Sequence, residues 1–231
     1  MSSILYLILV PALLPVILIL FYVYINDRAE REPAGFLSFV FIMGAVFSLP
    51  CAFIEPFLQA VFFADEDADL FNVFCRNVIA IAVVEEFSKW LVFRLFVWNN
   101  KNFNFRYDGI VYAVAASLGF AALENVFYIA SFGREIAFQR AVFAIPAHTT
   151  FGVFMGYFLA RQKSCELALY RSFDGKKALL IPVLIHGTYD FLLSDQVAAT
   201  GYQFVFFILV IVLDFAAWKM IRKGFKTDRE L

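Results

Sequence analysis

Polar breaks divide the chain into apolar stretches of about twenty residues, and this pattern constrains its fold more than any other feature. A bilayer core is about 30 Å thick, so a helix needs about 20 apolar residues to span it. Only 17% of the residues are charged and 62% are hydrophobic, whereas about 25% of a soluble domain is charged. Seven stretches are long enough, at 4–25, 36–63, 77–98, 108–131, 141–160, 178–194 and 201–221. The sequence therefore predicts an all-α, polytopic membrane bundle of about seven transmembrane helices.

No long polar segment separates these stretches, so we expect one integral membrane domain over residues 1–231. The net charge is −1 and no basic strip carries interleaved aromatic residues, which argues against a nucleic-acid partner. The three cysteines, Cys51, Cys75 and Cys165, have no paired spacing and are expected to pack as small apolar residues. The first stretch lacks a preceding Lys or Arg and a cleavage site of small residues, so it is expected to be a retained helix.

The basic residues are distributed unevenly between the two sets of connecting segments. Fourteen Lys and Arg residues fall on one side of the predicted bundle and two, Arg134 and Arg140, on the other. The sparse side also carries the acidic run at 65–69. Because loops that stay in the cytoplasm are enriched in Lys and Arg, the sequence predicts the N-terminus outside and the C-terminus inside.

Several ionisable residues nevertheless lie within the apolar stretches. An Asp, Lys or Arg at the centre of a spanning helix costs about 2.5–3.5 kcal/mol on insertion scales, so such groups normally face the protein interior or a water-filled cavity. We therefore regard this set as the candidate site and its surroundings. Its members are Glu55, Glu85, Glu86, Lys89, Glu124, His148, His186, Asp190 and Asp214.

Four of these groups, each on a different stretch, share one predicted depth. Counting from the outer end of each stretch places Glu85, Glu124, His148 and His186 seven to nine residues in. At 1.5 Å per residue they lie roughly 10–14 Å below the outer surface. Unrelated structural residues would not be expected to align in this way, so the sequence predicts one polar site in the outer half of the membrane.

The spacing of the polar residues suggests their chemistry. Lys89 follows Glu85 by one helical turn and can neutralise part of the charge of Glu85 and Glu86. A pair of carboxylates can supply a general base and a general acid.

Two further residues extend this set. Asp190 follows His186 by one turn and could orient its ring, while the Asn125 amide could hold a developing oxyanion.

Other residues of the set are expected to be structural. Glu55 is interpreted as a structural partner near the outer end of its stretch, and Asp214 as a partner of Lys219 near the inner surface. Gly152 and Gly156 form a GxxxG pattern one turn beyond His148. Small residues at this spacing allow membrane helices to approach closely.

Taken together, these motifs resemble the PrsW family of intramembrane proteases, distant relatives of the CAAX prenyl endopeptidases. The matching segments span roughly residues 80–195 and keep the family's order and spacing. They are VVEEFSKW (83–90), YDGIVYAVAASLGFAALEN (107–125), IPAHTTFGVFMGYFLA (145–160) and LIHGTYDF (184–191).

The resemblance implies an integral protein of a bacterial cell membrane and a role for particular residues. Glu85 and Glu86 would be the paired catalytic glutamates, with His148, His186, Glu124 and Asp190 completing the site. It also implies site-1 cleavage of a single-pass membrane substrate such as an anti-sigma factor, near the outer face.

Metal dependence is left open by the sequence. His148, His186 and Glu124 would make a zinc set with Glu86 as base. The chain has no HExxH motif, and a metal-free mechanism based on the glutamates is the alternative.

Two other classes of function also fit a polar cluster in a helical bundle. A proton-coupled transporter would relay protons through such groups, but its polar groups should extend towards both faces. A scaffold that only binds transmembrane helices would not need the Glu pair or both His residues.

Overall fold

The computed structural model describes residues 2–27, 30–64, 69–133, 135–202, 204–224 and 228–231. Within these residues the chain is helical, and the one β-type pairing is an isolated bridge between Phe105 and Glu230. The expected all-α class is confirmed for this part of the chain. Single helices are α1 (Ser2–Ile25), α2 (Ala34–Phe62), α5 (Arg106–Phe132), α8 (Ala168–Leu193), α9 (Asp195–Ala198) and α10 (Phe204–Gly224).

Two longer helical runs contain π-helical turns. One run consists of α3 (Leu70–Cys75), η1 (Arg76–Ala82), α4 (Val83–Val92) and η2 (Phe93–Val97). The other consists of α6 (Glu135–Gln139), η3 (Arg140–Ala144) and α7 (Ile145–Ser164). Such turns occur frequently at functional sites. Here η1 precedes the helix that carries Glu85 and Glu86, and η3 precedes the helix that carries His148.

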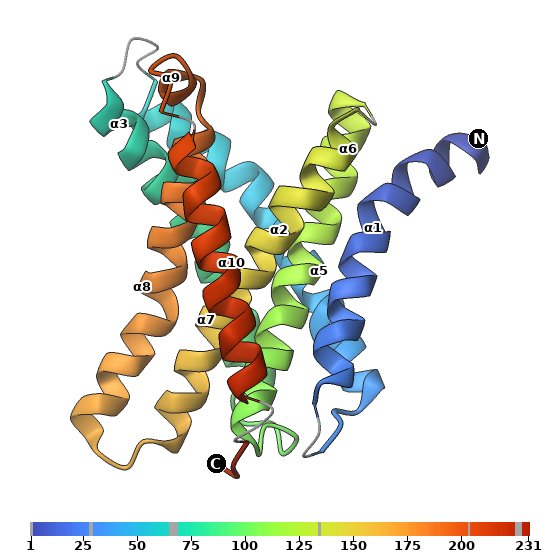
Figure 1. Ribbon diagram of the computed structural model, residues 1–231, viewed down its shortest axis with the longest axis vertical. Coiled ribbons are helices and arrows are strands. Elements are labelled where there is room, and N and C mark those ends of the chain that lie inside the picture. The colour runs from blue at the N-terminus through green and yellow to red at the C-terminus, as the bar shows by residue number, and fades with distance from the viewer. Residues whose placement is uncertain (1, 28–29, 65–68, 134, 203, 225–227) are drawn as a thin grey trace.

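Each of the seven predicted stretches coincides with a helix or a helical run. Four of the described helical segments are long and apolar enough to cross a membrane by length and composition, namely Ala34–Phe62, Arg106–Phe132, Glu135–Ser164 and Phe204–Gly224. The count of seven passes and the orientation of the termini stay predictions. Figure 1 places the N-terminus and the C-terminus at opposite ends of the bundle, as an odd number of passes requires.

Helix α5 lies at the centre of the bundle, between α2 and α7 (Figure 1). Glycines produce the close approach on both of its sides. Gly156 of α7 lies against the backbone of Gly109, and Gly119 of α5 lies against the backbone carbonyl of Phe41 in α2. The predicted role of the GxxxG pattern in packing is therefore confirmed, with α5 as its partner. Residues 107–122 of α5 are buried without interruption.

Large apolar side chains cover the outside of the bundle. Helix α10 exposes Phe207, Ile211 and Phe215, each by more than half of its surface. In water such a face would be unfavourable, but lipid tails are as apolar as these side chains. The many phenylalanines on the surface thus fit a bundle that is surrounded by lipid.

The contact between α7 and α5 leads to a first prediction. A methyl group at position 156 would overlap the backbone of Gly109, which cannot move aside as a flexible side chain can. We expect Gly156→Ala to destabilise the protein by about 1–3 kcal/mol, the usual cost of overpacking. The measurement is thermal unfolding of the purified protein in detergent.

The matched control is Gly35→Ala in α2, where an added methyl group meets open space. This control should unfold at the wild-type temperature or slightly above it, since Ala favours helix over Gly. Equal unfolding temperatures for Gly156→Ala and the wild type would contradict the proposed contact.

Candidate active site

The Lys89 ammonium lies at the centre of a buried polar network. Lys89 is on α4, and none of its surface is exposed. Its Nζ atom donates to Glu86 Oε1 at 2.7 Å and Glu85 Oε2 at 3.1 Å, and it lies 3.0 Å from His148 Nδ1. An ammonium group has three protons to donate, so these three partners satisfy it. The predicted neutralisation of the glutamates by Lys89 is thus present, and it extends to a histidine on α7.

His186, on α8, lies between two carboxylates. Its Nδ1 atom is 2.9 Å from Glu86 Oε1, and its Nε2 atom is 3.2 Å from Asp190 Oδ2. The ring stacks on Phe151, with a centroid separation of 4.7 Å. A carboxylate is thus in place to accept a proton from either nitrogen. The geometry agrees with the expected orientation of this ring by Asp190.

His148 has a different environment. The Lys89 ammonium can only donate, so His148 Nδ1 must accept, and the ring proton of the neutral histidine then lies on Nε2. That Nε2 atom lies 3.0 Å from Glu124 Oε2 on α5. Arg140 also pairs with this oxygen, at 3.0 Å from its Nη2 atom. Glu124 is therefore held between a histidine and an arginine.

A cavity of about 890 Å³ opens beside this network. Its lining also includes Gln59 near the end of α2, Phe132 at the end of α5 and Phe206 near the start of α10. Those positions lie at the end of the bundle that carries α3, α6 and α9 (Figure 1). The charged and histidine side chains that line it are Glu55, Glu85, Glu124, Arg140, His148, His186 and Asp190.

Two of the predicted site residues do not line this cavity. Glu86 is fully buried behind Glu85, where Lys89 and His186 bind its Oε1 atom. Asn125 is also fully buried, and its carbonyl oxygen accepts a hydrogen bond from Arg140 Nε. The structure therefore gives the Asn125 oxygen a role in positioning Arg140 and does not bring its amide to the cavity.

Two residues interpreted as structural lie elsewhere than expected. Glu55 lines the cavity together with Glu85. The predicted pairing of Asp214 with Lys219 is wrong for the described residues, since Asp214 Oδ1 accepts a hydrogen bond from Thr150 at 2.7 Å. Lys219 instead lies over the ring of Phe215. The pairing does not form because residues five positions apart on a helix with 3.6 residues per turn face different directions.

Arg140 is a site residue that the sequence indicated only as a marker of the outer surface. Its guanidinium reaches from η3 to Glu124 and stacks 4.0 Å from the centre of the Tyr128 ring. A signal was available in the sequence, because Arg140 precedes His148 by eight residues. Those eight residues are about two turns, so both side chains lie near one face of the helical run.

Two groups of residues in this network have the spacing that a metal ion needs. One group is Glu85, Glu86 and His186, and the other is Glu85, Glu124 and His148. In each group the candidate ligand atoms lie within 4.8 Å of one another. The predicted zinc set is thus divided between the two groups, and Glu85 is common to both.

The donor types fit a zinc ion, which binds imidazole nitrogen and carboxylate oxygen. Glu86 Oε2 is buried and has no hydrogen-bond partner among the described residues, so one carboxylate oxygen is available. Coordination through His148 Nε2 would place the ring proton on Nδ1. The Lys89 ammonium could then no longer donate to that nitrogen, so metal binding requires a local rearrangement of Lys89.

The chain is similar to a family of known membrane proteases. Residues 32–214 match the family described as PrsW family intramembrane metalloprotease. A protein named Protease PrsW from Oceanobacillus iheyensis is 36% identical over 199 residues, which cover 86% of this chain and 88% of the relative. The Protease PrsW of Bacillus subtilis is 32% identical over 213 residues, covering 92% and 91%.

A third relative, the Protease PrsW of Halalkalibacterium halodurans, aligns with nearly the whole chain. It is 32% identical over 222 residues, which cover 96% of this chain and 98% of the relative. No solved structure matches the chain. The resemblance drawn from the motifs is therefore confirmed, and it extends well beyond residues 80–195.

The buried ammonium leads to a second prediction. Lys89→Met would leave Glu86 buried without its cation, and breaking a buried pair in this way usually costs about 3–5 kcal/mol. The double variant Glu86→Gln with Lys89→Met removes the uncompensated charge, so it should be more stable than Lys89→Met alone. Both are measured by thermal unfolding in detergent.

Lys177→Met is the control, because its side chain is about half exposed. It should change the unfolding temperature little. Additive effects of the Glu86 and Lys89 substitutions would contradict a direct interaction between the two side chains.

Proposed function

The chain belongs to the PrsW family of intramembrane metalloproteases. From this premise we propose that it cleaves a peptide bond of a membrane-protein substrate in the cavity that Glu85 lines, the Glu85 cavity. The supporting observation is the buried network in which Glu85, Glu124, His148 and His186 meet at one cavity. Ionisable groups are costly in a membrane, and here they are brought together beside a space that a substrate segment can enter.

In the proposed mechanism Glu85 is the general base. It is the member of the glutamate pair that lines the cavity, so a water molecule there can transfer a proton to it. As general acid, the same carboxyl group then returns the proton to the leaving amine. Glu86 lies behind it and holds both Lys89 and His186 in place.

The oxyanion of the tetrahedral intermediate needs donors that face the cavity. His148, whose Nε2 atom carries the ring proton, and the guanidinium of Arg140 both line it. Preorganised donors of this kind stabilise developing negative charge. We propose that these two groups take this role, with Glu124 between them and Asn125 fixing the position of Arg140.

We propose that a zinc ion, where present, would be held by Glu85, Glu124 and His148, whose candidate ligand atoms lie within 4.8 Å of one another. Glu85 and His148 would then be ligands, and they act as base and oxyanion donor only without the ion. When bound, the ion would supply Lewis-acid activation of a water molecule. The residues themselves orient one another: Glu86 fixes the His186 ring, and Arg140 fixes Glu124. The mechanism without a metal, in which Glu85 is the base and His148 donates to the oxyanion, is the alternative.

The proposed substrate is a single-pass membrane protein such as an anti-sigma factor, cut near the outer face of a bacterial cell membrane. Aromatic side chains line much of the cavity, among them Phe127, Tyr128, Phe143 and Phe207. Such a lining suits an apolar segment. The cavity lies at the end of the bundle that the distribution of Lys and Arg assigns to the outside.

A third prediction tests the glutamates. Glu85→Gln removes the proposed base, and the loss of a general acid or base typically lowers the rate by about 10²–10⁴-fold. Glu86→Gln weakens the support of His186 and Lys89, so it should also lower the rate. The measurement is cleavage of a single-pass reporter substrate in liposomes.

The control is Glu166→Gln in the connection between α7 and α8, where the side chain is exposed. It should cleave at the wild-type rate. Wild-type rates for both Glu85→Gln and Glu86→Gln, in proteins with wild-type unfolding temperatures, would show that the proposed chemistry is wrong.

A fourth prediction concerns the metal. Purified wild-type protein should retain about one zinc ion per chain at this site. Catalytic zinc sites of this kind hold one ion with several protein ligands. His148→Ala and Glu124→Gln should each lose it, whereas Glu166→Gln should keep it. Elemental analysis after removal of loosely bound metal provides the measurement, and full cleavage by a protein without metal would favour the alternative mechanism.

A further inference from the structure

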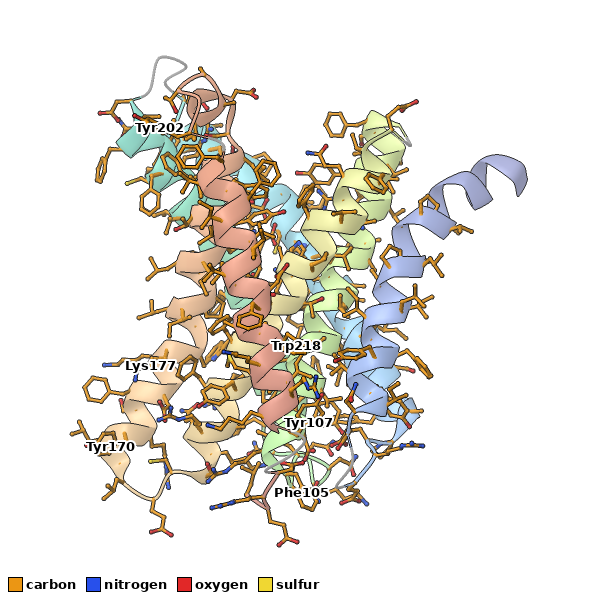
Figure 2. The ribbon with its side chains drawn as sticks, viewed as in Figure 1. Phe105, Tyr107, Tyr170, Lys177, Tyr202 and Trp218 are labelled. Carbon is orange, nitrogen blue, oxygen red and sulfur yellow. The ribbon has the colours of Figure 1, made fainter. Side chains whose placement is uncertain are left out.

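A second polar cluster lies at the end of the bundle opposite the cavity. It consists of Asp27 after α1, Glu32 before α2 and Asp108 in the first turn of α5. One carboxylate oxygen from each lies within 4.8 Å of the others. All three residues are almost completely buried, with exposed fractions of 1%, 4% and 0%. Figure 2 shows the neighbouring Phe105 and Tyr107 at this end, beside the C-terminus.

The cluster contains carboxylate oxygens without partners. Among the described residues, neither oxygen of Asp27 has a hydrogen-bond donor in place, although the backbone N–H of Glu32 lies near enough to favour its charged form. Asp108 uses Oδ2 to accept from the N–H groups of Asn104 and Phe105, while the described part of the chain offers no N–H or hydroxyl partner to its Oδ1. A buried polar group without a partner costs about 1–3 kcal/mol, and a charged one costs more. Among the described residues the cluster therefore lacks a cation, and the one hydrogen bond between its side chains, from Glu32 to Asp108, requires a protonated carboxyl group.

Within the described part of the chain, no nearby side chain supplies a positive charge to this cluster. No Lys or Arg there forms an ion pair with Asp27, Glu32 or Asp108. Lys163 is close enough to affect Asp108, but its ammonium donates to the carbonyl oxygens of Trp98 and Phe103. Glu32 accepts a hydrogen bond from the Tyr112 hydroxyl, which is a neutral donor.

A fourth carboxylate increases the negative charge. Asp228, in the C-terminal tail, accepts from the N–H groups of Tyr107 and Arg229 through Oδ1, while its buried Oδ2 has no hydrogen-bond partner among the residues that the structure describes. Burial, followed by the charges of Asp108 and Asp228, raises the pKa of Asp27 to about 7. Burial also raises the pKa of Glu32 to about 9. Without a cation, the cluster thus resists losing its protons.

We propose that Asp27, Glu32 and Asp108 form a binding site for a hard divalent cation, Ca²⁺ or Mg²⁺, with Asp228 beside it. Every candidate ligand in this cluster is an oxygen atom, which is the type that these two ions prefer, whereas zinc usually takes nitrogen or sulfur as well. The unpartnered oxygens of Asp27 and Asp108 would become ligands. The ion would join the α1–α2 connection to the start of α5.

The tail of the chain closes over the same region. Arg106 N–H donates to the carbonyl of Arg229, and Leu231 N–H donates to the carbonyl of Asn104. A cation here would therefore fix three parts of the chain that are distant in sequence. Its role is structural, because the Glu85 cavity lies at the other end of α5.

The experiment uses full-length protein in detergent, stripped with a chelator that is then removed. Thermal unfolding is followed at pH 8 while CaCl₂ or MgCl₂ is added, with KCl at matched ionic strength as a control. A ligand at a hundredfold excess over its Kd stabilises the folded state enough to raise the unfolding temperature by roughly 5–10 °C. We expect this saturable rise with Ca²⁺ or Mg²⁺ and none with KCl, and the ion with the lower midpoint identifies the preferred cation.

Variants assign the effect to this cluster. Asp27→Asn should abolish the rise, and Asp195→Asn, an exposed acidic residue of α9 at the other end, should keep it. His148→Ala should also keep it, which separates this site from the metal groups near Glu85. If Asp27→Asn does not fold, direct binding of Tb³⁺ to the wild type, measured by luminescence and by competition with Ca²⁺, provides the test.

Three results would overturn the proposal. They are an absence of any cation effect on the wild type with no binding of Tb³⁺, an equal rise in Asp27→Asn, and a rise that disappears in His148→Ala. The first would mean that the carboxyl groups share protons instead. In that case stability should fall steadily as the pH rises from 5 to 9 with or without cations, because groups whose pKa is raised on folding stabilise the folded state only while they are protonated.

Discussion

Burying charged groups in an apolar bundle costs free energy, and the rest of this structure depends on how that cost is offset. The Lys89 ammonium offsets it by binding the buried carboxylates. Glu85 and Glu86 are adjacent on α4, and without a cation two buried carboxylates would repel each other. One ammonium binds both and also reaches His148 on α7. Two of its three partners lie on α4 and the third lies on α7, so the ammonium joins the two helices. A single buried cation therefore both permits the glutamate pair and aligns it with a histidine.

The network can only form because the helices approach closely. Small residues along α5 bring its backbone against α2 on one side and α7 on the other. This arrangement places Glu124 beside His148 without a long side chain to bridge the gap. In lipid no hydrophobic effect drives helices together, so close packing and interhelical hydrogen bonds must do so. Here the glycines provide the close packing and the polar site provides the interhelical hydrogen bonds.

Much of this arrangement could be predicted from the sequence, for identifiable reasons. The thickness of a membrane sets the length of a spanning helix, so the positions of the helices could be predicted from the apolar stretches. A membrane also makes buried charge costly, so Glu85, Glu124, His148 and His186 could be identified as site residues. The direction of a side chain depends on helix rotation, which hydropathy does not specify. For that reason Asn125 was expected at the cavity although it lies behind Arg140.

Asp27 and Glu32 were not predicted to be buried, since charged residues in a connection between helices are usually exposed to solvent.

Helix α5 links the two polar clusters of the protein. Asp108 lies in its first turn and Glu124 lies sixteen residues later, a separation of about 24 Å along a helix. Residues 107–122, nearly all of the helix between them, are buried, so this segment cannot tilt without disturbing α2 and α7. A cation at Asp27, Glu32 and Asp108 would join the start of this helix to the α1–α2 connection, without making any contact with the cavity itself.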